Sequence, residues 1–318
     1  MGRINVCIAC DDNYAKYAAV VMASILKNAK EDDRLHFYIL DGGVTEENKN
    51  KTYELKKTIK DCEINFVPIN NELFTDYMNV KTHGYISLPT FYRLKAASLL
   101  PDVDKIIYFD CDMVINSSLD ELFNIDLDGH PIGGVNDIKK RMVKKNPTYV
   151  NAGMLVMDLN KFREDNVEQK FLDWTKEHFD EIKVGDQQII NEALMGDIKL
   201  LPATWNVQSS NFTNRSSYVK RPNIIHYVGN QKPWKPASWN YFKNLFREYR
   251  QLTEWKVDDT PEEIKKDDFQ GMLGYIKYRP LFFLRPRFYK ALWFTYIWQK
   301  WTFSKSDSLF NRKSEMEV

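Results

Sequence analysis

The sequence of 318 residues predicts an α/β fold in which strands and helices alternate. Short β-prone runs rich in Val, Ile and aromatic residues are separated by longer segments whose apolar residues recur at helical spacing. One run, Lys105–Asp110, is apolar and then ends in carboxylates, as expected of a buried strand whose carboxyl end borders a ligand site. A hydrophobic fraction of 43% supplies enough side chains for a substantial core.

The predicted elements follow one another with short loops. Strand 4–10, helix 13–29, strand 36–40, helix 45–59 and strand 63–68 form a βαβαβ order, which predicts parallel strands joined by right-handed crossovers. Beyond these, the pattern predicts a helix at 90–100, the strand 105–110, a helical turn at 119–123, strands at 132–136 and 153–158, and helices at 167–179 and 187–194.

Three regions differ in composition: a body over residues 1–250, a polar linker over 251–270 and a basic aromatic extension, expected to be helical, over 271–318. Within the extension, residues 271–305 contain seven Lys or Arg, no acidic residue and twelve aromatic residues. Its apolar runs are shorter than the roughly 20 residues needed to span a bilayer. Such a composition favours binding to an anionic membrane surface, with RNA binding or packing on the body as the alternatives.

The N-terminus and the cysteine usage predict a cytoplasmic protein. A net charge of +1 is no argument for a nucleic-acid partner, so none is expected. The chain starts directly with a strand and shows no signal-peptide pattern. With the basic extension, this predicts a peripheral protein on the inner face of the plasma membrane. The pair Cys7-x-x-Cys10 fits core packing better than a redox or zinc site, because no second Cys pair or His cluster completes such a site.

Asp110 and Asp112 are the first candidates for a site. Two carboxylates one residue apart at the end of a buried strand are costly without a cation, so a divalent metal is the natural partner, and a surface turn is the alternative. Neither the dinucleotide fingerprint nor the P-loop motif occurs. Asp110–Val114 also fits the nucleophile loop of haloacid-dehalogenase phosphatases, although about 105 residues precede it. A catalytically silent carbohydrate-binding protein is a third possibility.

Four stretches together resemble the retaining nucleotide-sugar glycosyltransferases of family 8, the galactosyltransferase and glycogenin group. They are Ala9–Tyr14, the Asp-x-Asp motif Asp110–Asp112, Asn151–Leu155 followed by Gly185–Gln188, and His226–Trp234. Their order and spacing resemble bacterial lipooligosaccharide α-galactosyltransferases most, over about residues 3–245. The resemblance implies a GT-A fold, which is a Rossmann-like mixed sheet flanked by helices.

The same resemblance implies a function. The enzyme would be a hexosyltransferase that moves galactose or glucose from a UDP-sugar to a saccharide acceptor, lipid-linked or protein-linked, with retention of configuration. Lipooligosaccharide, capsule, other cell-surface glycans and glycoprotein glycans are the expected products. The implied cofactor is Mn²⁺, with Mg²⁺ as the alternative, because an imidazole beside carboxylates favours Mn²⁺.

The resemblance also assigns roles to individual residues. The metal ligands would be Asp110, Asp112 and His226, and the catalytic residues Gln187 and Asp186. The nucleotide-binding residues would be Ala9, Asp11, Asn13, Ile86, Arg93, Cys111, Gly229 and Lys232. The donor sugar would contact Arg93, Asp137, Asn151, Ala152, Gly153, Asp186 and Gln187. Since an amide is a poor nucleophile, the preferred hypothesis is a same-face displacement in which Gln187 stabilises a cationic transition state.

Several of these residues also have purely structural interpretations. His226 could be a hydrogen-bonded core histidine, and Arg93 could be an exposed helical arginine without a function. Asn13 could cap the helix that follows it, and Asp186 could cap the helix that it begins.

Overall fold

The computed structural model describes residues 2–78, 80, 88–138, 140–208, 222–229, 232–235, 240 and 242–256. The predicted extension over 271–318 and the linker beyond Lys256 lie outside these residues. At the start of the predicted linker, Trp255 packs against the core and Thr253 is buried. None of the described helices has the length and apolar character needed to cross a bilayer.

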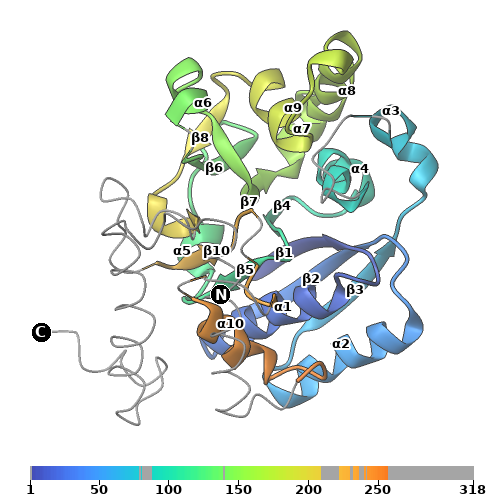
Figure 1. Cartoon of the computed structure of the whole chain (residues 1–318), viewed down its shortest axis with the longest axis vertical. Helices are drawn as coiled ribbons and strands as arrows, with labels where there is room; N and C mark the ends of the chain where they lie inside the picture. Colours follow the sequence, from blue (N-terminus) through green and yellow to red (C-terminus); the bar gives the residue numbers. More distant parts are fainter. Residues whose placement is uncertain are drawn as a thin grey trace, which may run out of the picture.

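A mixed sheet forms the centre of the described residues (Figure 1). Its seven strands have the spatial order β3-β2-β1-β4-β7-β6-β8. Strand β1 pairs in parallel with both β2 and β4, whereas β7 runs antiparallel to β4 and β6. The strands are β1 (Arg3–Cys10), β2 (Arg34–Asp41), β3 (Glu63–Pro68), β4 (Lys105–Phe109), β6 (Ile132–Asn136), β7 (Val150–Asp158) and β8 (Ile198–Leu200).

Helices cover both faces of this sheet (Figure 1). Because side chains alternate along a strand, Val6 and Ile8 of β1 face the core under α1 and α2, whereas Cys7 and Ala9 face the core under α4, α7, α8 and α9. The helices are α1 (Ala15–Asn28), α2 (Glu46–Thr58), α3 (Thr75–Met78), α4 (Ala96–Leu99), α5 (Asp120–Phe123), α6 (Lys140–Lys145), α7 (Leu159–Glu164), α8 (Val167–Glu177), α9 (Asp186–Ala193) and α10 (Lys243–Arg250).

A second, small sheet lies beside the first and has the order β5-β10-β9. It consists of β5 (Met113–Ile115), β9 (Val207–Gln208) and β10 (Ile224–His226). Leu245 and Phe246 of α10 pack on it together with Val20 of α1. The small sheet therefore brings the C-terminal part of the described chain against the end of β4, where the Asp-x-Asp motif lies.

Two predicted elements differ from the structure. The segment predicted as a helix over 90–100 is a 3-10 helix, Leu88–Lys95, followed by the single turn α4. Over so few residues the 3.0-residue period of a 3-10 helix and the 3.6-residue period of an α-helix place apolar side chains on nearly the same face. The spacing of apolar residues therefore does not distinguish the two helix types. Strand β7 begins at Val150 and not at Gly153, because Val150 already pairs with Asn136. The parallel β1, β2 and β3 confirm the βαβαβ prediction.

Cysteine packing also agrees with the sequence. Cys7 and Cys10 are both free and buried, and they lie in the hydrophobic cores on opposite faces of the sheet.

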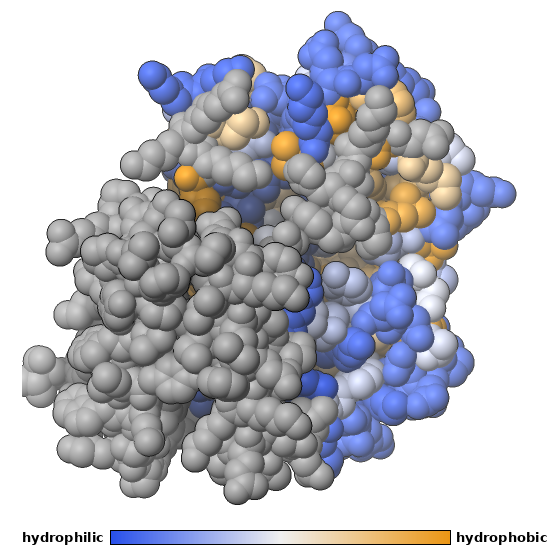
Figure 2. All heavy atoms as spheres, viewed as in Figure 1, coloured by the Kyte–Doolittle hydropathy of each residue, from blue (hydrophilic) through white to orange (hydrophobic). Residues whose placement is uncertain are grey.

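On the face shown in Figure 2, the described surface is mostly hydrophilic and carries only small apolar patches. Among the described residues, the exposed large apolar side chains are Leu73, Met78, Met195, Leu200 and Leu252.

Candidate active site

A cavity of about 520 Å³ opens at the carboxyl ends of β1 and β4. The chain leaves β1 towards β2 on one side, while β4 lies on its other side, so these two strands form the topological switch point at which open α/β sheets bind ligands. Cys111 Sγ donates to the Ala9 carbonyl at 3.4 Å and ties the two strand ends together. The volume is in the range of small-molecule sites.

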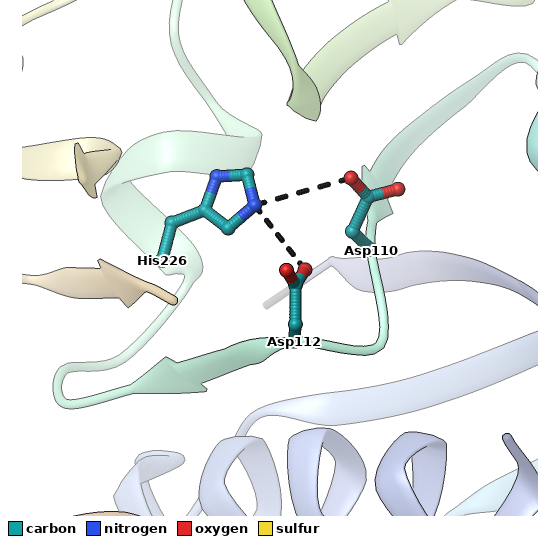
Figure 3. Close-up of side chains that lie close together, drawn as sticks. All are labelled: Asp110, Asp112 and His226. Atoms are coloured by element: carbon teal, nitrogen blue, oxygen red, sulfur yellow. Dashed lines mark ion pairs between the residues drawn. The ribbon is translucent and has the colours of Figure 1, made fainter. Parts of the chain in front are cut away.

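Three ligand-type side chains converge at the base of this cavity. The Nε2 atom of His226 lies 3.2 Å from Asp112 Oδ1 and 4.0 Å from Asp110 Oδ2 (Figure 3). One ligand atom from each of the three residues lies within 4.8 Å of the other two. The imidazole is 4% exposed and the Asp110 side chain 30% exposed, so the cluster is open towards the cavity on the Asp110 side.

Strand pairing brings His226 to the Asp-x-Asp motif across more than 100 residues of sequence. Asp110–Asp112 connects β4 to β5, and His226, the last residue of β10, pairs with Met113, the first residue of β5. The Tyr227 amide donates to the Asp112 carbonyl at 2.9 Å and continues this pairing. Strand β10, Ile224–His226, is apolar except for its last residue. It can pack in this small sheet only if the His226 imidazole has polar partners.

The loop after β10 adds a cation. The ammonium of Lys232 pairs with Asp112 and donates to the Tyr227 carbonyl at 3.0 Å. Burial alone would raise the pKa of Asp112, but Lys232 and His226 hold that pKa well below its usual range, so the carboxylate is ionised. Trp234 stacks on Tyr17 of α1 with ring centroids 3.8 Å apart, and this contact anchors the loop to the body.

Arg93 connects the Asp110 side of the cavity to α9. Its guanidinium donates to Asp110 Oδ1 at 2.6 Å and to the Ala152 carbonyl at 2.5 Å, and its Nε lies 3.1 Å from Asp186 Oδ2. Arg93 is only 2% exposed and stacks over the Tyr108 ring at 4.1 Å. The interpretation of Arg93 as an exposed helical arginine is therefore wrong.

Burial raises the pKa of Asp186 to about 6, although Arg93 opposes the shift. Among the described residues, Asp186 Oδ2 has no aligned hydrogen-bond donor. Gly185, with φ of 65°, is the N-cap residue of α9, so Asp186 faces Arg93 instead of capping the helix.

The amide of Gln187 is held from three sides. Its Oε1 accepts from Asn151 Nδ2 at 3.1 Å and from the Ala152 amide at 3.2 Å, and its Nε2 donates to Asp137 Oδ2 at 2.9 Å. Both lone pairs of the Gln187 oxygen are thus engaged. This arrangement fits a fixed dipole better than a nucleophile.

Gly153 is required by the carboxylate and imidazole cluster. A Cβ at this position would lie 2.3 Å from His226 Cε1 and 2.8 Å from Asp110 Oδ2. The family resemblance places Gly153 among the donor-sugar contacts, and the structure adds a steric reason for a glycine here. The missing side chain leaves room for the ligand cluster itself.

The donor set suits a divalent cation. Two carboxylates and an imidazole present oxygen and nitrogen ligands of the kind that Mn²⁺ accepts, and they converge with little protein between them. The buried, ionised Asp112 carries a negative charge that a bound cation would offset.

Most of the sequence-predicted residues line the one cavity. Asn13 is exposed and is not part of the lining, and Ile86 lies outside the described residues. Tyr14, not Asn13, is the N-cap residue of α1, and its amide donates to Asp11 Oδ1 at 3.0 Å. The predicted residues in the lining are Ala9, Asp11, Arg93, Asp110, Cys111, Asp112, Asp137, Asn151, Ala152, Gly153, Asp186, Gln187, His226, Gly229 and Lys232.

Sequence reasoning missed several lining residues, among them Tyr14, Tyr108, Gln208 and Trp234. Tyr14 and Trp234 lie within two of the stretches that resemble family 8, so the sequence could have indicated both as site residues. Gln208 lies outside every quoted stretch, and only the pairing of β9 with β10 places it beside His226.

Comparison with known proteins identifies the family. The model of glycosyl transferase family 8 matches residues 5–238, which is well over half of the chain. The chain belongs to glycosyl transferase family 8. A putative glycosyltransferase of Haemophilus influenzae is 33% identical over 245 residues, covering 73% of each chain. The lipopolysaccharide 1,2-glucosyltransferase of Escherichia coli is 26% identical over 317 residues, covering 87% of each chain.

Solved structures agree with this family. The galactosyltransferase LgtC, crystallised with donor and acceptor sugar analogues, has a TM-score of 0.69 to this chain at 25% identity. The match covers 83% of this chain and 100% of LgtC. The chain therefore has the GT-A fold of a family 8 glycosyltransferase, as the four stretches predicted, and the phosphatase alternative is wrong.

Proposed function

We propose that this family 8 glycosyltransferase transfers galactose or glucose from a UDP-sugar to a saccharide acceptor, with retention of configuration. The observation that carries the proposal is the convergence of Asp110, Asp112 and His226 beside the half-buried Gln187 in one cavity at the switch point. A cation-binding cluster next to a polar wall suits a ligand that combines a diphosphate with a sugar.

The nucleotide half would lie between the ends of β1 and β4. Asp11 and Ala9 line this part of the cavity and provide polar contacts for a nucleoside, and Lys232 supplies an ammonium for the diphosphate. Asp110, Asp112 and His226 would hold the divalent ion, Mn²⁺ or else Mg²⁺. When bound, that ion supplies Lewis acidity that stabilises the departing diphosphate by several kcal/mol.

The sugar half would lie against β7 and the start of α9. Asp186 lines the cavity beside Arg93 and would present its carboxylate to a sugar hydroxyl. Asn151, Asp137 and Gln187 form a polar wall beside it. Hexose hydroxyls require such carboxylates and amides.

The held Gln187 supports a same-face displacement. The acceptor oxygen forms its bond to the anomeric carbon on the side from which the diphosphate leaves, and the acceptor proton passes to a phosphate oxygen of the leaving group. The Gln187 oxygen dipole stabilises the positive charge that develops on the sugar ring. Because that oxygen already accepts two hydrogen bonds, it stays in place as the charge develops.

The test is UDP release from a panel of UDP-sugars, with Mn²⁺ or with chelator, by the wild-type protein and by His226→Ala. We expect release from one UDP-hexose, dependent on Mn²⁺ and lost in the variant. Equal release with chelator would remove the metal from the proposal, and Mn²⁺-dependent release from a non-hexose donor alone would overturn the donor assignment.

Two relatives support a specific proposal for the acceptor, namely a saccharide on the cell surface. The lipopolysaccharide 1,2-glucosyltransferase acts on such a glycan, and LgtC was crystallised with an acceptor sugar analogue.

For the basic aromatic residues 271–318, we propose binding to an anionic membrane surface on the cytoplasmic side, near a lipid-linked acceptor. The full chain should then sediment with anionic vesicles and not with neutral ones; equal sedimentation with both would argue against a charge-driven contact.

A further inference from the structure

Two backbone amides determine how the side-chain amides of the active site are oriented. The Gly153 N–H lies 3.1 Å from Asn151 Oδ1, and the Ala152 N–H lies 3.2 Å from Gln187 Oε1. A backbone N–H is always a donor, so each of these side chains turns its oxygen towards the strand. Asn151 then directs its amino group to Gln187 Oε1, at 3.1 Å.

Asn206 continues this chain of hydrogen bonds towards His226. Its Nδ2 lies 3.0 Å from Asn151 Oδ1, and since that oxygen accepts, Asn206 must present its amino group there. Its own Oδ1 then lies on the other side, 3.1 Å from His226 Nδ1. An amide oxygen only accepts, so His226 Nδ1 carries a proton.

The consequence for His226 is that Nε2 is the ring nitrogen that faces the carboxylates and is available to a cation, because Nδ1 is committed to Asn206. Nε2 is the atom that lies between Asp112 Oδ1 and Asp110 Oδ2 in Figure 3. A neutral imidazole protonated at Nδ1 offers the Nε2 lone pair to a cation held by both carboxylates. The opposite tautomer would direct an N–H into the cluster and could not act as a ligand.

The position of Asn206 is set by the same small sheet that carries His226. It lies between the 3-10 helix Ala203–Trp205 and β9, and β9 pairs in parallel with β10 so that Gln208 is opposite His226. Asn206 is 1% exposed, and both ends of its amide have partners. A buried amide is tolerated when it is satisfied in this way, and it is then held rigidly.

We propose that Asn206 is a positioning residue that fixes the tautomer and ring orientation of His226 for cation binding and links that ligand, through Asn151, to Gln187. The inference rests on the proposed metal-dependent function. None of the four stretches that resemble family 8 includes Asn206. Partners of this kind orient metal-binding imidazoles, and their loss lowers metal affinity about 10- to 100-fold.

The experiment measures Mn²⁺ affinity by calorimetry together with the protonation of His226 Nδ1 by ¹⁵N NMR of the metal-free protein. The wild type should show Nδ1 protonated. Asn206→Leu, which is similar in size but lacks the amide, should lower Mn²⁺ affinity about 10- to 100-fold and release the tautomer preference. Asn206→Asp keeps an acceptor for Nδ1–H but loses the donor to Asn151 Oδ1, so it should recover part of the affinity that Asn206→Leu loses.

Asn223→Ala is the matched control. Asn223 lies next to β10 and its side chain donates to Thr204 Oγ1 at 3.4 Å and not to His226, so this variant should bind Mn²⁺ like the wild type. Should Asn206→Leu not fold, the wild-type tautomer and the Asn206→Asp affinity still decide the matter. A wild-type ring without a proton on Nδ1, or no recovery of Mn²⁺ affinity in Asn206→Asp, would overturn the role of Asn206.

Failure of the proposed function would look different. A wild type that binds no Mn²⁺ would overturn the metal centre, and with it the contribution of Asn206 to cation binding. Equal Mn²⁺ affinity in the wild type and in Asn206→Leu would overturn only the role of Asn206. Neither measurement uses turnover, so an incorrect donor sugar does not affect them.

Discussion

Replacing Gly153 by alanine tests the steric argument for the ligand cluster. The new Cβ would lie 2.3 Å from His226 Cε1, where ordinary contacts begin at 3.4 Å, so the imidazole or strand β7 must move by about 1 Å. The carboxylate of Asp110 is crowded as well, at 2.8 Å. Overpacking of this kind costs about 1–3 kcal/mol of stability, and displacing a ligand by this amount should weaken Mn²⁺ binding at least about tenfold.

The assay is calorimetric titration of Mn²⁺, combined with urea unfolding in the presence of chelator. Gly134→Ala in β6 is the matched control, because its Cβ would lie 2.9 Å from Val150 Cβ, away from the ligand cluster. Both variants should lose stability, and only Gly153→Ala should lose Mn²⁺ affinity. Wild-type Mn²⁺ affinity in Gly153→Ala would refute the view that this glycine makes room for the cluster.

Three further variants separate the roles within the cavity. Asp112→Asn should slow Mn²⁺-dependent transfer about 100-fold or more, because several kcal/mol of charge stabilisation are lost; full activity in the UDP-release assay would remove Asp112 from the mechanism. Gln187→Ala should keep UDP affinity while slowing transfer on the order of 100-fold, and a loss of UDP affinity alone would move Gln187 to the nucleotide site. Asp186→Asn tests a pH dependence: burial raises the pKa of Asp186 from 3.8 to about 6, so its contribution to stability is complete below pH 3.8 and is lost as the pH rises through 6. The unfolding free energy of the wild type, relative to Asp186→Asn, should therefore fall by up to about 3 kcal/mol between pH 4 and pH 7, and a pH-independent difference in urea unfolding would contradict the raised pKa.

The sequence predicts the parts of the site that are local in the chain. Asp110 and Asp112 are adjacent to a strongly apolar strand, so both the strand and its carboxylates are visible in one short segment. The strands β1, β2 and β3 are likewise predicted because their periods and loops are regular. Family resemblance adds His226, which the apolar run Ile224–Ile225 alone would not separate from a core histidine.

What the sequence does not predict depends on contacts between distant segments. Arg93 is buried only because Asp110, Asp186 and the Ala152 carbonyl meet around it, and these groups come from three other parts of the chain. Asn206 acquires its partners only when β9 pairs with β10. A polar residue between two apolar ones has no periodic pattern that would distinguish it from a loop residue.

The central claim is that Asp110, Asp112 and His226 hold a divalent cation that receives a nucleotide diphosphate, and the most direct measurement is calorimetric titration of UDP into the wild-type protein with Mn²⁺ and with chelator. The account predicts UDP binding that requires Mn²⁺. UDP binding of equal affinity in chelator would contradict it.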